Sequence, residues 1–335
     1  MILIHKNLKF KCLFVITLLL SVLTVGCSKN KSEPGSSEKI VLTSFYPMYI
    51  AALNVTENIS GIRLVNMAAP AAGCLHDYQL TASDAALLEK ASVLIVNGGG
   101  MESFLEKAVS LNKKLVVIDA SKDVEFIRSI VDDIHNHRSH SHSYRHHHNN
   151  HKDHKDNKDN ETDDAAEVNS HVWLSIDNYI QQVKTIAGHL AAWDSVNSGG
   201  YAGNAQTFAD ALQEFKTEAN KKLADISNRK IAVFHEGFVY FAQEFGLTVA
   251  AVIEREPGVE PNAAEIISTV RTIKKAGVKA LFTEPQYTSA AARTISAETG
   301  LPLFTLDPVV SGSMTKDSYI TAMKKNIETL KEALQ

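Results

Sequence analysis

The sequence lacks any cluster of basic residues. Its 335 residues carry a formal net charge of −4, and loss of residues 1–26, which hold three lysines and no acid, takes this to −7. No run of Lys and Arg with interleaved aromatic side chains occurs, although such runs are typical of nucleic-acid binding. Nucleic acid is therefore excluded as a partner. With 44% hydrophobic residues, the chain is long enough to build two domains with real cores.

The N-terminus carries an apolar run, residues 12–25, behind lysines at 6, 9 and 11. Such a run is typical of a secretory signal peptide and is too short for a stable membrane span. Residues 23–27 resemble a bacterial lipobox, although Leu23 lies one place further from the cysteine than usual. We expect residues 1–26 to be a lipoprotein signal peptide, Cys27 to carry the lipid, and 27–38 to be a flexible tether. The alternative is an ordinary cleaved signal with an incidental cysteine.

Cysteine is scarce, with three in the whole chain. Cys12 would leave with the signal peptide and Cys27 would be lipidated, so Cys74 alone remains in the folded part. The mature protein is therefore expected to have no intrachain disulfide. Cys74 has two interpretations, a buried structural cysteine or a thiolate within reach of a soft metal.

From residue 39 onward, buried strand patterns alternate with helical ones, which predicts a doubly wound parallel sheet. Pro47 fits the first turn of a helix, and Thr81 and Asp84 have the spacing of a capping box. The expected strands cover residues 39–45, 62–67, 92–97 and 114–121 in the first half, and 230–234, 248–254, 279–284 and 301–306 in the second. The fold class is therefore α/β with two lobes, each a small parallel sheet flanked by helices.

One long amphipathic helix is predicted between the two halves, over residues 201–227. Its apolar residues follow a spacing of three and four, and it would run for roughly 40 Å at 1.5 Å per residue. We expect an N-terminal lobe over 39–198, a rigid linking helix over 199–228 and a C-terminal lobe over 229–335.

A polar segment with a dense histidine tract interrupts the first lobe. Residues 132–167 hold nine acids, five Lys or Arg and almost nothing apolar, so we expect a disordered loop. Neutral imidazole binds Zn, Cu and Ni well, and a histidine-rich tract indicates a protein that binds or transports transition metals. The alternatives to metal binding are a polar insertion that has become rich in histidine by sequence drift, or an engineered tag. The accessory metal-binding histidines would be His135, His137, His140, His142, His146, His147, His148, His151 and His154.

Three other histidines and one aspartate occupy the positions where an α/β protein binds ligands. His76 lies in the loop after the second expected strand, His171 where apolar sequence resumes, and His235 directly after a strand. Asp307 directly follows the last expected strand. Ligands of open parallel sheets bind beyond the carboxyl ends of the strands, and three imidazoles with one carboxylate make a compact Zn²⁺ site.

Several motifs together resemble the substrate-binding proteins of zinc and manganese ABC transporters, of the zinc-uptake type of solute-binding protein family 9. The motifs are HDYQLTASD (76–84), HVWLS (171–175), VFHEGFVYFAQEFGL (233–247), EPGVEPNAAEI (256–266), TEPQYTSAAA (283–292) and LDP (306–308). The resemblance implies metal ligands at His76, His171, His235 and Asp307, in a cleft between the lobes. It also implies that Zn²⁺ is the transported ligand rather than a cofactor of catalysis. Zinc members typically carry a His- and acid-rich loop at 132–167 and manganese members generally lack one, so zinc is favoured.

The resemblance also implies partners and a location. We expect an extracytoplasmic protein held to the membrane through lipid on Cys27, monomeric, that delivers its ion to an ABC permease with its ATPase. Two departures affect the ligand set: Leu75 stands where some zinc members place a carboxylate ligand, and Cys74 is unusual. The fourth ligand is then Asp307 or water.

Other functions remain as alternatives: a manganese- or iron-binding member of the same family, a metal-binding adhesin, or a zinc hydrolase. The hydrolase hypothesis rests on HEGFV (235–239), but the HExxH motif requires histidine at the position of Val239. Glu236 would act as a base only at a metal that kept an open position. No catalysis is therefore expected. Glu256, Glu260 and Glu284 belong either to the cleft rim or, like most charged loop residues, simply to the solvated surface.

Overall fold

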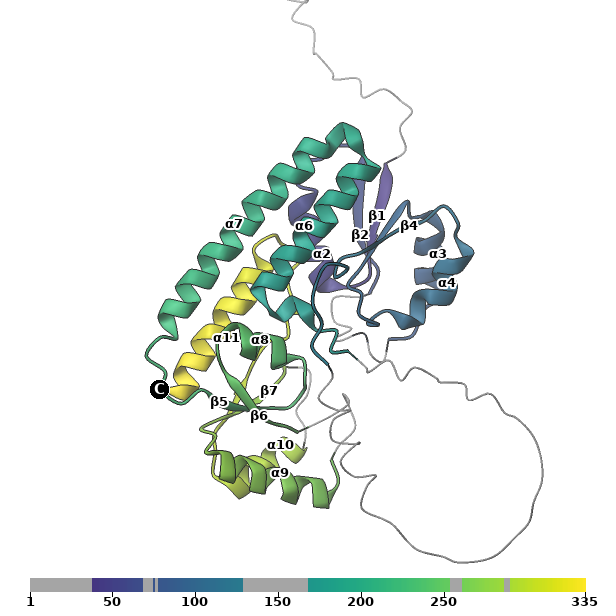
Figure 1. The fold of residues 1–335 in the computed structure, drawn as a ribbon. Coiled ribbons are helices and arrows are strands. Elements are labelled where there is room, and N and C mark those ends of the chain that lie inside the picture. Colours follow the sequence, from purple (N-terminus) through teal and green to yellow (C-terminus); the bar gives the residue numbers. More distant parts are fainter. Residues whose placement is uncertain (1–37, 69–74, 76–77, 129–167, 254–260, 286–289) are drawn as a thin grey trace, which may run out of the picture. The chain divides into compact units, whose positions relative to one another are not determined.

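The computed structural model describes residues 38–68, 75, 78–128, 168–253, 261–285 and 290–335 (Figure 1). Residues 38–335 form one compact unit. The expected signal peptide, the tether with Cys27, the histidine tract and the residues Cys74 and His76 lie outside the described segments. Among the helices of these segments, none combines the length and apolar content needed to cross a membrane.

The described chain contains two four-stranded parallel sheets with the same topology. The first has the order β2-β1-β3-β4 and the second the order β6-β5-β7-β8. The strands are β1 (Lys39–Thr43), β2 (Ile62–Asn66), β3 (Val93–Val96), β4 (Val116–Asp119), β5 (Lys230–Val233), β6 (Thr248–Val252), β7 (Leu281–Thr283) and β8 (Leu303–Thr305). Each lies within a strand range predicted from the sequence, so the predicted fold class is confirmed.

Helices connect and cover the strands. They are α2 (Tyr46–Val55), α3 (Ala82–Lys90), α4 (Glu106–Leu111), α6 (Ile176–Trp193), α7 (Ser198–Lys222), α8 (Phe238–Glu244), α9 (Ala263–Ala276), α10 (Ala290–Thr299) and α11 (Ser318–Leu334). The predicted capping box is present, because the Thr81 hydroxyl accepts from Asp84 N–H while the Asp84 carboxylate accepts from Thr81 N–H.

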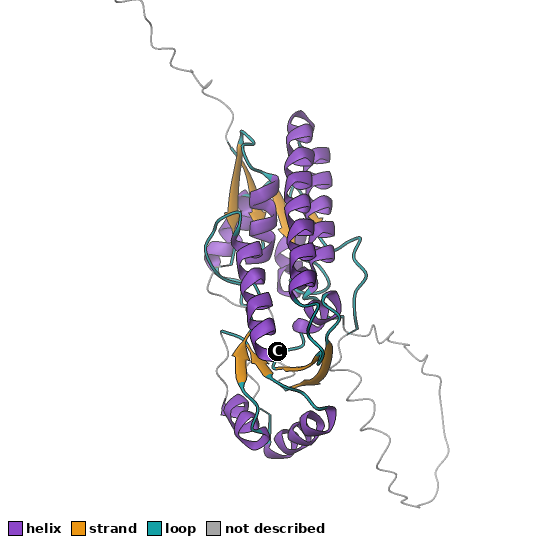
Figure 2. Cartoon of the chain, turned by 90° about the vertical axis from the view of Figure 1, so that its left-hand side faces the viewer, coloured by secondary structure: helices purple, strands orange, loops and turns teal. Residues whose placement is uncertain are grey.

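The long helix α7 differs from its prediction at both ends. It begins three residues earlier than expected, at Ser198, so Gly199 and Gly200 form its first turn, and it ends at Lys222 rather than 227. A Cβ on Gly200 would lie 2.5 Å from the end of the Ile59 side chain, so glycine lets α7 approach it closely, whereas a Cβ on Gly199 would meet nothing within 4 Å. The predicted apolar stripe is buried along its whole length. α7 packs on α2, α6 and α11, and Figures 1 and 2 show it running alongside α11.

Both sheets bury both faces, as parallel sheets usually do. On β1, Leu42 faces a small cluster with α3 while Val41 faces the large core, and on β5 Ala232 and Val233 divide in the same way. The large core takes residues from both sheets and from α2, α6, α7, α8 and α11. The two lobes are thus distinct as sheets but share one apolar core.

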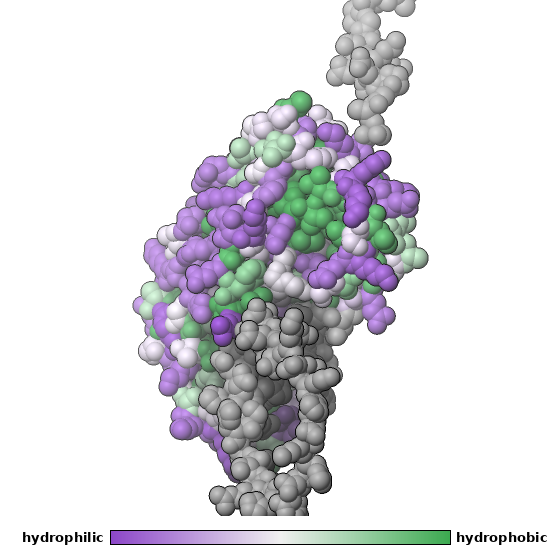
Figure 3. Space-filling model, turned by 45° about the vertical axis from the view of Figure 1, so that its right-hand side comes forward, coloured by the Kyte–Doolittle hydropathy of each residue, from purple (hydrophilic) through white to green (hydrophobic). Residues whose placement is uncertain are grey.

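Strand β4 forms an exposed edge of the first sheet. Val116 and Val117 are 38% and 41% exposed. Figure 3 shows apolar side chains gathered on this side of the molecule, bordered by polar ones. The neighbouring Lys113, Lys114 and Lys122 place charge beside the edge, which is a common protection against unwanted strand pairing.

Candidate metal centre

His171 and His235 come together at the ends of elements from different halves of the chain. His235 lies two residues beyond β5, and His171 directly precedes a short 3-10 turn, Val172–Leu174. Their ring centroids are 4.6 Å apart with the planes at 80°, and both residues are buried. Two of the histidines predicted from the sequence are therefore neighbours.

Gly237 makes this approach possible. A Cβ at this position would lie 3.0 Å from His171 Cδ2 and 3.0 Å from His235 Nδ1. The backbone here is ordinary right-handed helix, φ −51°. Glycine is therefore required for space between the two rings and not for backbone conformation.

Glu256 and Glu260 lie outside the described residues. For Glu284, the interpretation as a solvated loop residue is wrong. It directly follows β7 (Leu281–Thr283), its side chain is 3% exposed, and its Oε1 lies 3.4 Å from His235 Nδ1. Strand β7 pairs with β5, so parallel pairing brings the two strand ends together. The Gly237 N–H donates to this same nitrogen at 3.3 Å. Glu284 therefore places a buried carboxylate directly beside the His235 ring.

Asp307 lies two residues beyond β8 (Leu303–Thr305) and is held by its own neighbourhood. Asn326 accepts from the Asp307 N–H at 2.7 Å and donates to its carbonyl at 2.8 Å, while Asp307 Oδ1 accepts from Val309 N–H. Burial raises the pKa of the Asp307 carboxyl, against the lowering effects of the Val309 amide and Lys325. Val309 has φ +58°, a strained value for a β-branched residue.

Trp173 connects this aspartate segment to His171. Its indole N–H donates to the Pro308 carbonyl at 2.8 Å, and its ring lies 5.2 Å from that of His171. Within the described residues, no three His, Cys, Asp or Glu side chains are close enough to hold a metal ion together. The structure thus pairs His171 with His235, does not add Asp307 to them as a third ligand, and does not describe His76.

Leu75 and His189 behave as structural residues. Leu75, which stands where some relatives have a carboxylate, is buried in the large core. His189 lies in α6, and its Nδ1 is 2.9 Å from the Thr185 carbonyl, one turn earlier in the same helix. Val239 occupies the second position of α8, so the second histidine of a metalloprotease helix is absent from the sequence.

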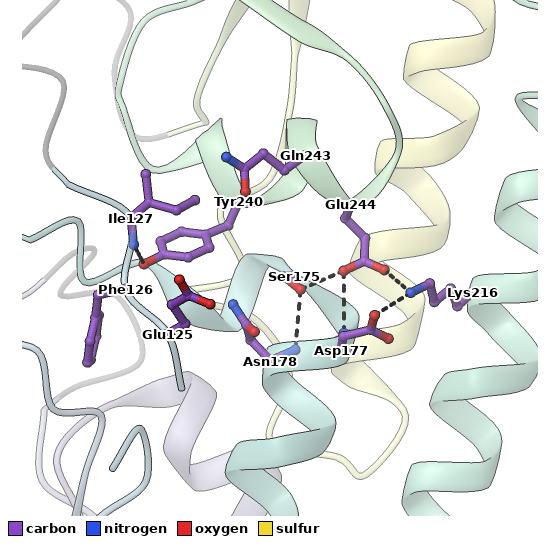
Figure 4. Close-up of a pocket in the computed structure, with 10 residues that line it drawn as sticks. All are labelled: Glu125, Phe126, Ile127, Ser175, Asp177, Asn178, Lys216, Tyr240, Gln243 and Glu244. Carbon is purple, nitrogen blue, oxygen red and sulfur yellow. Dashed lines mark hydrogen bonds and ion pairs between the residues drawn. The ribbon is translucent and has the colours of Figure 1, made fainter. Parts of the chain in front are cut away.

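A cavity of about 550 Å³ lies between α6, α7, α8 and residues 125–127 (Figure 4). Its charged groups are Glu125, Asp177, Glu244 and Lys216. The Lys216 ammonium lies 2.6 Å from both Asp177 and Glu244, and Ser175 donates to Glu244. The ammonium already occupies the place a metal cation would need, so this cavity is not a metal site.

The fold is one shared with a known class of proteins. Two parallel four-stranded sheets of one strand order, joined by a long helix, are the architecture of the metal solute-binding proteins among the similar solved structures. Residues 41–333 match the model of the family described as zinc-uptake complex component A, periplasmic, and the chain belongs to this family. This confirms the resemblance seen in the sequence motifs.

The relatives differ in the metal for which they are named. Zinc-binding protein AdcA of Streptococcus pyogenes serotype M3 is 24% identical over 331 residues, which cover 97% of this chain and 61% of AdcA. This chain therefore spans about three fifths of AdcA. The manganese ABC transporter substrate-binding lipoprotein PsaA of Streptococcus mitis is 25% identical, with 97% and 99% covered. The structure of FpvC from Pseudomonas aeruginosa with Mn²⁺ has a TM-score of 0.72 and 25% identity, covering 89% of this chain and 98% of FpvC.

Proposed function

We propose that this protein captures Zn²⁺ outside the cytoplasm and delivers it to the permease and ATPase of an ABC importer. The observation that carries the proposal is the buried pair His171 and His235, held at a strand end beside the buried Glu284. Imidazole nitrogens with a neighbouring carboxylate suit Zn²⁺, whereas Mn²⁺ prefers oxygen ligands. Membership of the zinc-uptake family supports the same ion.

The proposed ligands are His76, His171, His235 and Asp307, with water as the alternative to the aspartate. His171 and His235 supply two nitrogens from opposite halves of the chain, so a bound ion would link the two sheets. The Trp173 hydrogen bond to the Pro308 carbonyl ties the segment of Asp307 to that of His171, and Asp307 is close enough to Glu284 for that carboxylate to raise its pKa. In the proposed division into an N-terminal lobe (39–198) and a C-terminal lobe (229–335), the ion would bind between the two lobes.

Lipid on Cys27 would hold the protein at the membrane surface, and a monomer suffices for this role. The relatives AdcA and PsaA are named as a zinc-binding protein and a manganese-transport lipoprotein, which supports the anchor and the extracytoplasmic location. The histidines of residues 135–154 would gather zinc weakly near the site. A tract without fixed geometry cannot itself provide a tight, selective site.

The test is titration of Zn²⁺ and Mn²⁺ into residues 28–335, into a variant lacking 135–154, and into His171→Ala and His235→Ala. We expect one tight zinc that survives the deletion and weakens by at least about 100-fold in either alanine variant, since outer-shell changes alone cost 10–100-fold. His189→Ala is the matched control, because this histidine contacts its own helix. Loss of tight binding with the tract, or tight binding that persists without His235, would refute the site.

A further inference from the structure

Asn169 lies two residues before His171 and contacts it twice. The Asn169 Oδ1 lies 3.1 Å from the His171 backbone N–H and 2.9 Å from the ring Nδ1. Its Nδ2 lies 2.9 Å from the Glu236 carbonyl, next to His235. One buried amide therefore touches both histidine segments.

The orientation of this amide follows from its partners. The Glu236 carbonyl can only accept, so the Asn169 NH₂ must face it, and the amide oxygen must face His171. An amide oxygen can only accept, so His171 Nδ1 must carry its proton. Nε2 is then the unprotonated nitrogen, which is the form of imidazole that coordinates a metal.

Tyr240 on α8 fixes the position of Asn169. Its hydroxyl donates to the Asn169 carbonyl at 2.7 Å and accepts from Ile127 N–H at 2.9 Å, a contact drawn in Figure 4. The Asn169 N–H donates to the Ile127 carbonyl at 2.9 Å. Burial raises the pKa of Tyr240 to about 12, so the hydroxyl keeps its proton and remains a donor.

The first sheet holds the next residue. Asn97, directly after β3, donates to the Ser170 carbonyl at 2.9 Å, and Gln182 on α6 donates to the Asn97 side-chain oxygen at 2.9 Å. Residues 169 and 170 are therefore fixed by hydrogen bonds from α8 and from the end of β3, and α6 in turn fixes Asn97. The segment that carries His171 cannot shift without breaking several buried hydrogen bonds.

We propose that Asn169 is the positioning residue of the metal centre: it holds His171 as the Nδ1–H tautomer and, through the Glu236 carbonyl, sets the spacing between His171 and His235. This rests on the proposed function only in taking His171 as a ligand. The tautomer itself is a property of the metal-free protein. Zinc then binds to a ring that is already oriented, and no rotamer or tautomer change accompanies capture.

The decisive measurement is the pair of ring ¹⁵N shifts of His171 in metal-free protein, at a pH well above ~6.5, the ordinary histidine pKa. The His171 signals are assigned by their loss in His171→Ala. The wild type should show a protonated Nδ1 and an unprotonated Nε2. A protonated Nε2 in the wild type overturns the proposal, whatever the variants do.

Two substitutions separate the roles of the amide. Asn169→Asp keeps an acceptor for His171 but cannot donate to Glu236, so the Nδ1–H tautomer should persist. Asn169→Ala removes both contacts, so the tautomer should become mixed and zinc affinity should fall 10–100-fold. Asn169→Asp should lose less affinity than Asn169→Ala, since the ring stays oriented.

The matched control is Asn204→Ala. Asn204 on α7 also donates from a half-buried amide to two carbonyls, those of Val55 and Glu57. It should leave zinc affinity and the His171 shifts unchanged. If Asn169→Ala retains both the wild-type tautomer and the wild-type affinity, the positioning role is refuted. If His171→Ala binds zinc normally, the proposed ligand fails while the tautomer result still stands.

Discussion

At the scale of single residues, the proposed metal centre depends on residues that were not among the predicted ligands. Asn169, Gly237 and Glu284 each contact one or both of the paired histidines, although none was predicted to do so from the sequence. His235 was predicted because it directly follows a strand, and His171 because it lies where apolar sequence resumes. The missed residues each also contact a segment more than 40 residues away, and for these contacts sequence spacing gives no signal.

Gly237→Ala should weaken zinc binding about 10-fold, the low end of the effect of outer-shell changes. The new methyl group would lie 3.0 Å from both rings, so the rings must separate by a few tenths of an ångström. Isothermal titration measures the change. Gly188→Ala is the control, because a Cβ there meets nothing within 4 Å, and a helix gains up to about 1 kcal/mol from the exchange. Equal affinity in Gly237→Ala and wild type would contradict the argument.

Glu102 should make stability depend on pH. Its carboxylate accepts from Ser44 and Asn97, both at 2.7 Å, and from the Gly98 amide, yet burial raises its pKa from 4.5 to about 7. Below 4.5 the folded and unfolded forms are both protonated. Between 4.5 and 7 the folded form holds the extra proton, so stability falls as pH rises through this window.

A shift of this size corresponds to about 3 kcal/mol. Urea unfolding at pH 5 and pH 8 should show the wild type losing about this much more stability than Glu102→Gln over the same interval. Glu106→Gln, at an exposed position in α4, should follow the wild type. A Glu102→Gln variant with the full pH dependence would show that other groups cause it.

At the scale of elements, capping signals were the most readable part of the sequence. The Thr81 box was predicted and is present. The end of α9 at Gly277, where φ is +69°, has the left-handed glycine that often ends a helix. The ends of α7 were predicted less well. The sequence Ser198-Gly199-Gly200 reads as a linker, but packing on α2 and α6 overrides the low helix propensity of glycine.

Asn262→Ala should destabilise the protein by about 1 kcal/mol, the usual cost of losing an N-cap. The Asn262 side chain accepts from Ala264 and Glu265 N–H, and Glu265 in turn accepts from Asn262 N–H at 2.9 Å. Asn262→Ser keeps a capping oxygen and should lose much less. Chemical denaturation of the two variants measures the difference, and equal losses would mean that the cap contributes nothing.

At the scale of the whole molecule, the two sheets should unfold together because their inner faces share one core. Val41 on β1 and Val233 on β5 both belong to it and are fully buried. Either valine replaced by alanine should cost about 2 kcal/mol, including the cavity left behind.

The position of the tryptophans makes this a sharp experiment. Both precede α7 and lie in the predicted N-terminal lobe, residues 39–198: Trp173 and Trp193. In Val233→Ala, a second-half change, the tryptophan fluorescence midpoint in urea should shift as far as the circular dichroism midpoint. Val41→Ala serves as the matched first-half variant. If fluorescence stays at the wild-type midpoint in Val233→Ala, the halves unfold independently.

The shared core also makes the order of synthesis matter. The Tyr46 hydroxyl donates to the Ser313 carbonyl, Asn54 donates to the Lys316 carbonyl, and Tyr319 stacks on Tyr179 with ring centroids 3.9 Å apart. The first helix of the described chain therefore lacks these partners until residues 313–319 have left the ribosome. Contacts between such distant residues slow folding, because the intervening chain must be ordered first. A nascent chain would therefore stay loosely folded until this segment has been made, which is the state that a translocation channel accepts.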